Sequence, residues 1–168
     1  PFFGRVFWEW CYYHRLRFLI PPPFFPKTPY LWQSKGFNSL ASFEMEIGTQ
    51  ALHTYTVTLD DTAMRHGSGD LDVLATPRLV AMIEEVAKNL MSSDLISTET
   101  SVGTAVSLQH LKASAIGAEV LVRVKLIEKD GRRYTFTAEA YEGEKLIGKG
   151  EHTRCVVDKS RFLAGLNR

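Results

Sequence analysis

The chain has 168 residues, of which 45% are hydrophobic and 23% are charged, and its formal net charge is +1. This composition is typical of one globular domain with an extension, and the charge gives no indication of a nucleic-acid partner. The two cysteines, Cys11 and Cys155, are far apart and in no metal-ligand spacing. We therefore expect neither a disulfide framework nor a zinc site, and a reduced intracellular compartment, cytoplasmic or mitochondrial, is the default.

The first forty residues differ from the rest of the chain. They hold 13 of the aromatic residues (Phe 10, Tyr 6, Trp 3 in all) and carry five basic side chains against one acidic one. Prolines between Pro21 and Pro26 interrupt the most apolar run, which is shorter than the roughly 18–20 residues that span a bilayer. An organellar transit segment, a peripheral membrane anchor and an unstructured extension are the alternatives for residues 1–40. A further alternative, since the chain begins at Pro1, is that the sequence is a fragment, a processed form or a gene-model artefact.

Residues 41–168 have the regular patterns of a folded domain. Alternating and apolar runs predict six strands, and a 3.6-residue period predicts one long helix and one short one. In chain order the expected elements are strands at Phe43–Ile47 and Leu52–Leu59, a helix at Pro77–Met91, strands at Thr104–Leu111, Glu119–Lys129, Arg132–Tyr141 and Lys145–Asp158, and a short helix at Ser160–Leu166. Loops are expected at Asp60–Gly69 and Ser92–Ser101, and Asp130-Gly131 is a strong hairpin signal.

The helix at Pro77–Met91 is the element around which we expect the domain to fold. Thr76 is a good N-cap residue, and Pro77 suits the first helical position, where no N–H is needed. One wide apolar stripe follows at helical spacing: Leu79, Val80, Ile83, Val86, Ala87, Leu90 and Met91. Glu84 lies on the flank of this stripe, whereas Glu85 turns toward solvent. A carboxylate in that position is ion-paired, hydrogen-bonded or functional, and a surface ion pair is the simplest alternative.

One long apolar helix and a run of antiparallel strands predict a two-layer α+β domain. The inward faces are expected to be Val120, Val122, Val124 and Leu126 on one strand and Tyr134, Phe136, Ala138 and Ala140 on the next. Gly148 and Gly150, inside the last strand, indicate a bulge or a close approach of two backbones. If the sheet is strongly curved around the helix, the domain, from about residue 43 to 160, has a hot-dog fold.

Three blocks of the chain resemble the fluoroacetyl-CoA thioesterase-like family of hot-dog proteins. In order they read GSGDLDVLATPRLVAMIEEVA, SVGTAVSLQHLKASAIGAEVLVRV and GRRYTFTAEAYEGEKLIGKGEHTRCVVD. The resemblance covers roughly Leu52–Phe162 and leaves the first forty residues without a counterpart. It implies a hydrolase for a short or small acyl-CoA thioester and a homodimer with its sites at the interface. It implies no cofactor, because coenzyme A is part of the substrate.

The resemblance also assigns roles to individual residues. The catalytic Thr, Glu and His of the family fall on Thr76, Glu84 and His110, and its substrate-binding glycine and arginine fall on Gly103 and Arg154. Glu84 would be the general base or the nucleophile, His110 the proton shuttle and Thr76 a positioning group. Thr76 and Glu84 are separated by about 12 Å of helix rise, so the fold or a second subunit must bring the three groups together.

Two other classes of function remain open at this stage. One is a non-catalytic acyl-CoA or lipid-binding domain, and the other is a dimeric interaction module whose aromatic extension contacts a membrane. The presence of all three catalytic residue types favours the enzyme. Candidates for contacts to the phosphates of coenzyme A are Lys112, Arg132, Arg133 and Arg154.

Overall fold

The computed structural model describes residues 45–166, so the predictions made for the first forty residues lie outside the described part. The chain in this part forms strand β1 (Gln50–Thr56), 3-10 helix η1 (Leu59–Asp61), helix α2 (Thr76–Met91), 3-10 helix η2 (Ser92–Asp94), strands β2 (Glu99–His110), β3 (Glu119–Asp130), β4 (Arg133–Glu142) and β5 (Lys145–Asp158), and helix α3 (Lys159–Leu166). None of the described helices is long and apolar enough to cross a membrane.

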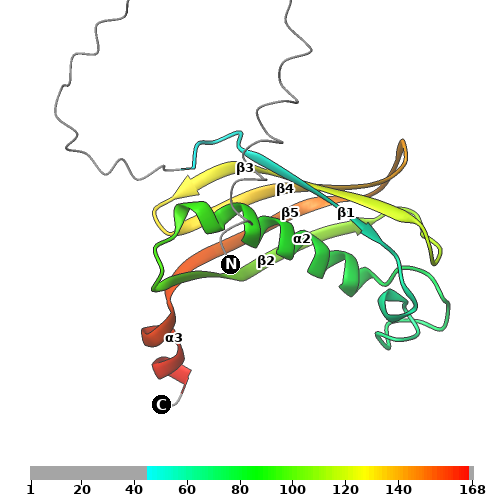
Figure 1. The fold of residues 1–168 in the computed structure, drawn as a ribbon, viewed down its shortest axis with the longest axis horizontal. Coiled ribbons are helices and arrows are strands. Elements are labelled where there is room, and N and C mark those ends of the chain that lie inside the picture. Colours follow the sequence, from blue (N-terminus) through cyan, green and yellow to red (C-terminus); the bar gives the residue numbers. More distant parts are fainter. Residues whose placement is uncertain (1–44, 167–168) are drawn as a thin grey trace, which may run out of the picture. The chain divides into compact units, whose positions relative to one another are not determined.

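The five strands form one antiparallel sheet in the order β1-β3-β4-β5-β2. Figure 1 shows α2 lying across one face of this sheet, with β1 and β2 at its two edges. The structure therefore has the α+β hot-dog architecture that the sequence predicts, a sheet wrapped around one central helix. In this fold the start of α2 and the end of β2 lie close together, as shown below.

The core lies between α2 and the sheet, and its residues follow the predicted periods. The helix buries Leu79, Met82, Ile83, Val86, Ala87 and Met91, and the two central strands bury Val120, Val122, Val124, Leu126, Tyr134, Phe136, Ala138 and Ala140. Full burial of one large aliphatic side chain contributes roughly 1.5–3 kcal/mol. The predicted inward faces of both strands are confirmed, and Met82 joins the predicted helical stripe while Val80 and Leu90 are only half-buried.

Three of the predicted strands differ from the structure. Strand β1 spans Gln50–Thr56 and not the predicted Leu52–Leu59, so it begins two residues earlier and ends three residues earlier. The described residues of the strand predicted at Phe43–Ile47 form no strand: residues 45–49 form irregular structure and a turn, with Gly48 at φ +98°. Met45 is held instead by its backbone N–H, which donates to Asp94 Oδ1 at 2.7 Å. Strand β2 begins at Glu99, five residues before the predicted start, because residues 99–103 pair with the end of β5. Pairing with a distant strand extends β2 into a stretch whose polar sequence had predicted a loop.

The start of α2 also differs from the prediction. Ala75, not Thr76, is the N-cap residue and makes no side-chain cap bond, so Thr76 is the first residue of the helix and Pro77 the second. Asp61 holds this helix start in place: its carbonyl accepts from Ala75 N at 2.9 Å, and its carboxylate accepts from Arg78 Nε at 2.5 Å. Burial raises the pKa of Asp61, but its bonds to Thr58 and Arg78 outweigh burial and lower it. These bonds of Asp61 do not involve the Thr76 hydroxyl, which can therefore bond to another partner.

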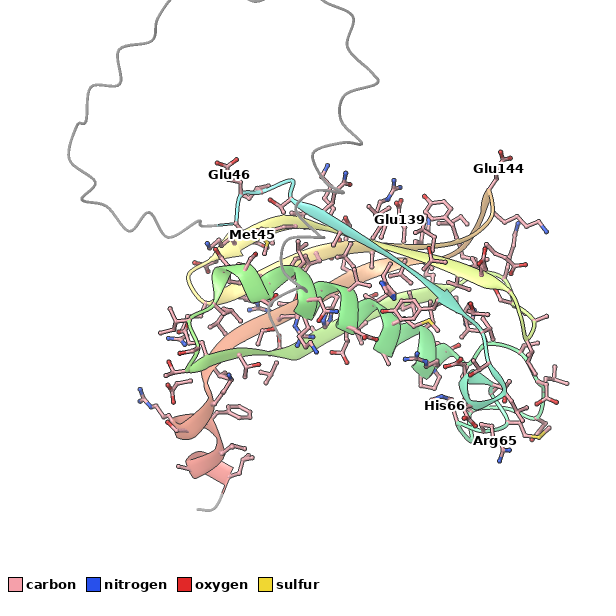
Figure 2. All side chains as sticks on the ribbon, in the orientation of Figure 1. Met45, Glu46, Arg65, His66, Glu139 and Glu144 are labelled. Atoms are coloured by element: carbon pink, nitrogen blue, oxygen red, sulfur yellow. The ribbon has the colours of Figure 1, made fainter. Side chains whose placement is uncertain are left out.

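The loop between η1 and α2 carries polar side chains away from the sheet. Figure 2 shows Arg65 and His66 at this loop, beyond the N-terminal end of α2.

The predicted close approach of backbones in β5 is present, because a Cβ on Gly150 would lie 1.9 Å from Ser107 O. Only glycine fits there, and β2 and β5 can pair closely as a result.

Candidate active site

The first part of the site is the Thr76–His110 pair. Thr76 is the first residue of α2 and His110 is the last residue of β2, and Thr76 Oγ1 lies 2.9 Å from His110 Nδ1. Burial lowers the pKa of His110 below its ordinary value, and the nearby Lys112 backbone only partly opposes this. The imidazole is therefore neutral at pH 7 and able to accept a proton.

The pair opens into a pocket of about 320 Å³. The other residues that line this pocket are Ala63, Ser68, Val73, Leu74, Leu111, Lys112 and Ala113. His110 Nε2 is buried and has no hydrogen-bond partner among the described residues.

The second part of the site is the Glu84 cluster, which consists of Glu84, Gly103, His152 and Arg154. Glu84 Oε1 lies 3.6 Å from Arg154 Nη1 and 3.6 Å from His152 Nε2. The Glu84 side chain is 42% exposed, whereas those of Arg154 and His152 are 6% and 1% exposed. A partly exposed carboxylate therefore lies directly over a buried cation, and Glu85 beside it faces solvent as predicted.

Gly103 belongs to this cluster because the Glu84 carboxylate fills the space where a side chain would be. A Cβ on Gly103 would lie 2.1 Å from Glu84 Oε1 and 3.2 Å from His152 Cε1. Gly103 pairs with Arg154 just before a register shift in the β2–β5 ladder. The bulge at this point brings the β2 backbone and the carboxylate together.

Arg154 has most of its donors committed to the protein. Its Nε donates to Ser101 Oγ at 2.9 Å, its Nη2 donates to Ser101 O at 2.8 Å, and its Nη1 lies 3.2 Å from His152 Nε2.

His152 was not predicted from the sequence as a site residue, although a signal was present. Two polar residues, His152 and Arg154, alternate on the inward face of a strand that is otherwise apolar on that face.

The structure brings together Thr76 with His110, and Glu84 with Gly103 and Arg154. No hydrogen bond or ion pair in the described part of the chain joins these two groups. This separation agrees with the helix rise between Thr76 and Glu84. One chain therefore holds two separate groups of candidate residues, at the start and in the middle of α2.

The four candidate phosphate-binding residues lie in different places. Lys112 lines the pocket of the Thr76–His110 pair, whereas Arg132 forms an ion pair with Glu99 at 2.8 Å. Arg133 is exposed at the start of β4, and Arg154 is buried. Within residues 45–166, no group of three or more His, Cys, Asp or Glu side chains is placed to hold a metal ion.

The close approach at Gly103 leads to a prediction. In Gly103→Ala, the new methyl group displaces the Glu84 carboxylate, which is the end of a flexible side chain, and we expect little loss of stability. We expect a fall in kcat/KM of about 10²-fold, because a displacement near 1 Å has that effect on a catalytic group. Steady-state kinetics and a thermal melt measure the two effects.

Gly150→Ala is the matched control for this prediction. Its methyl group meets backbone at Ser107 O, which cannot rotate away, so the melting temperature should fall sharply. If Gly103→Ala keeps wild-type turnover, then the position of the Glu84 carboxylate is not important for the reaction.

The chain is similar to known thioesterases in sequence and in structure. The family model of the fluoroacetyl-CoA-specific thioesterase matches residues 57–160. The fluoroacetyl-CoA thioesterase of Streptantibioticus cattleyicolor is 33% identical over 93 residues, which cover 55% of this chain and 67% of that protein. A variant of a fluoroacetyl-CoA thioesterase solved with acetyl-CoA has a TM-score of 0.70 at 27% identity, covering 73% of this chain and 97% of that one. A thioesterase superfamily member from Thermus thermophilus has a TM-score of 0.68 at 26% identity, covering 73% and 91%.

Proposed function

The chain belongs to the fluoroacetyl-CoA-specific thioesterase family, and we propose that Thr76, His110 and Glu84 carry out its reaction on a small acyl-CoA thioester. Membership of this family makes the protein an acyl-CoA thioesterase. The observation that carries the assignment of residues is the 2.9 Å contact of Thr76 Oγ1 with His110 Nδ1 in a pocket. The small acyl group is supported by the relatives, one of which is named for fluoroacetyl-CoA and was solved with acetyl-CoA.

The proposed reaction breaks the bond between the acyl carbon and sulfur and adds water. In one route Glu84 takes a proton from water, whose oxygen attacks the acyl carbon. In the other, the Glu84 carboxylate itself attacks, and water then hydrolyses the resulting anhydride. In both routes the thiolate of coenzyme A leaves. The neutral His110 takes up the proton that the attacking water loses, by way of Glu84 in the first route, and passes it to the thiolate. Backbone N–H groups at the start of α2 are suited to the developing oxyanion.

The complete site in this proposal forms between two copies of the chain. Within one described chain no hydrogen bond or ion pair joins Glu84 to the Thr76–His110 pair, and β2 is an edge strand whose residues 103–107 are exposed. An unpaired edge of this kind is a template for pairing with another strand. We propose that two copies pair along β2 and that each site takes Thr76 and His110 from one copy and Glu84 from the other.

An assay over acyl-CoA esters of increasing chain length, with detection of the free thiol, tests the proposed function. The panel includes fluoroacetyl-CoA and acetyl-CoA, and we expect kcat/KM to be highest for the small acyl groups. A preference for long chains would contradict the small-acyl assignment. Binding of acyl-CoA by folded protein without any thiol release would favour the non-catalytic alternative. The mass of the protein in solution tests the dimer.

Lys112 provides a prediction about the coenzyme A moiety. It is exposed and lines the same pocket as Thr76 and His110, so we propose that its ammonium group contacts a phosphate of the substrate. Lys112→Ala should raise KM about two- to tenfold, the range for one exposed charge contact, and leave kcat nearly unchanged. Steady-state kinetics at two salt concentrations measure this.

Lys88→Ala is the control for the Lys112 variant, because Lys88 is an exposed lysine in the last turn of α2, far along the helix from Thr76. An equal rise in KM in both variants would mean that only the overall charge of the protein matters. An unchanged KM in Lys112→Ala would remove Lys112 from the substrate site.

A further inference from the structure

His152 is a buried histidine whose two ring nitrogens have opposite hydrogen-bonding partners. Nδ1 lies 3.0 Å from the carbonyl oxygen of Ala105, and Nε2 lies 3.2 Å from Arg154 Nη1. A carbonyl oxygen can only accept, and a guanidinium can only donate. Both contacts are therefore hydrogen bonds in only one form of the ring, the neutral imidazole with its proton on Nδ1.

We propose that His152 is a positioning residue for the reaction, which holds Arg154 under the Glu84 carboxylate and does so only as this neutral tautomer. The inference rests on the proposed role of Glu84. Arg154 is fixed from one side by Ser101, through Nε and Nη2, and from the other by His152, through Nη1. Nη1 is also the guanidinium nitrogen that lies 3.6 Å from Glu84 Oε1. Nη1 also donates to the Glu84 carbonyl oxygen at 3.5 Å, and His152 provides its shorter contact. His152 thus helps to set the position of the cation that the carboxylate faces.

The charged groups around His152 come from two elements. Helix α2 contributes Glu84, and β5 itself contributes Arg154. The other two packed strands contribute no charge at this point: β2 provides Ser101, Gly103 and the carbonyl of Ala105, and β4 pairs Phe136 with His152. The nearest cation and the nearest anion therefore act on the ring in opposite directions.

Protonation of His152 would reverse its contact with Arg154. A proton on Nε2 replaces the acceptor with a donor and places two cations 3.2 Å apart in a buried site. Burial lowers the pKa of His152, and the charge of Arg154 lowers it further, against the bond to Ala105 and the charge of Glu84. The ring is therefore neutral at pH 7. As the pH falls through this lowered pKa, Arg154 loses its acceptor, and activity falls with it.

Two substitutions separate positioning from simple packing. His152→Gln keeps an uncharged acceptor for Arg154 that does not titrate, and we expect it to remain within about tenfold of the wild-type kcat/KM at pH 7.5. His152→Leu fills the space but leaves an Arg154 N–H buried without an acceptor, and should be a further ten- to hundredfold or so slower. The limiting slope of log(kcat/KM) against pH on the acid side should fall by about one unit in His152→Gln, because protonation of residue 152 no longer contributes to that limb.

Nitrogen-15 NMR of the histidine rings in the wild-type protein tests the inference without an activity measurement. We expect the His152 ring to carry its proton on Nδ1 at pH 7, with an unprotonated Nε2. A proton on Nε2 at pH 7, equal activity of the Gln and Leu variants, or an unchanged acid slope in His152→Gln would overturn it. Failure of the proposed function looks different: Glu84→Gln would then be fully active while the NMR still shows the Nδ1 tautomer.

Discussion

Replacing Glu84 with glutamine is expected to lower kcat/KM by about 10²- to 10⁴-fold, the range for loss of a general base. Glutamine has nearly the same shape and still forms hydrogen bonds, but it can neither take a proton from water nor attack a thioester. The protein should remain folded, because the Glu84 carboxylate is partly exposed and ion pairs of this kind contribute little to stability. Arg154 keeps its bonds to Ser101 and His152.

Glu85→Gln is the matched control for this substitution. It makes the same chemical change one residue further along the helix, where the carboxylate is exposed and accepts from Tyr55 OH at 3.2 Å. We expect this variant to have wild-type turnover. If Glu84→Gln is folded and turns over acyl-CoA at the wild-type rate, Glu84 is an ordinary carboxylate on the flank of an apolar helix. A burst of free thiol in rapid-mixing experiments on the wild type would favour the nucleophile route over the base route.

The sequence predicted those parts of the fold that depend on local periodicity. The apolar stripe of α2 and the alternation in β3 and β4 are the patterns that a helix and a half-buried sheet require, and both are present. The boundaries set by distant pairing were wrong. Strand β2 extends back to Glu99 because it pairs with Asp158, a partner that no local pattern indicates.

In the candidate site, too, local patterns predicted some features and distant contacts decided others. Glu84 was identified because a carboxylate breaks an apolar stripe, which is a local signal. The Thr76 hydroxyl was predicted to cap α2, but the structure places it against His110, a residue 34 positions away. The alternation of His152 with Arg154 along β5 was a local signal that was overlooked. The contact of the His152 ring with Ala105 could not be predicted, because it depends on the pairing of β5 with the bulged strand β2.

Replacing His110 with alanine is expected to lower kcat by about 10²- to 10⁴-fold, because the variant loses its proton shuttle. Since burial lowers the pKa of His110, the wild-type imidazole becomes neutral as the pH rises through a value below its ordinary one, and activity rises with it. His110→Ala should flatten this acid limb. Thr76→Ser keeps the hydroxyl that contacts His110 and should be milder than Thr76→Ala. A pH profile that is unchanged in His110→Ala would remove His110 from the proton transfer.

Mixing two inactive variants then tests whether each site is shared between two copies of the chain or lies within one copy. In a dimer with one Glu84→Gln copy and one His110→Ala copy, one of the two shared sites contains both an intact Glu84 and an intact His110. Co-expression or refolding of the two variants together should therefore restore about a quarter of the wild-type activity, because about half of randomly paired dimers are mixed and each of these has one intact site of two. The double variant Glu84→Gln/His110→Ala, mixed with itself, is the control and should stay inactive. If the mixture is no more active than its two components, each site lies within a single copy, and the chain must bring Glu84 to the Thr76–His110 pair by a movement along α2.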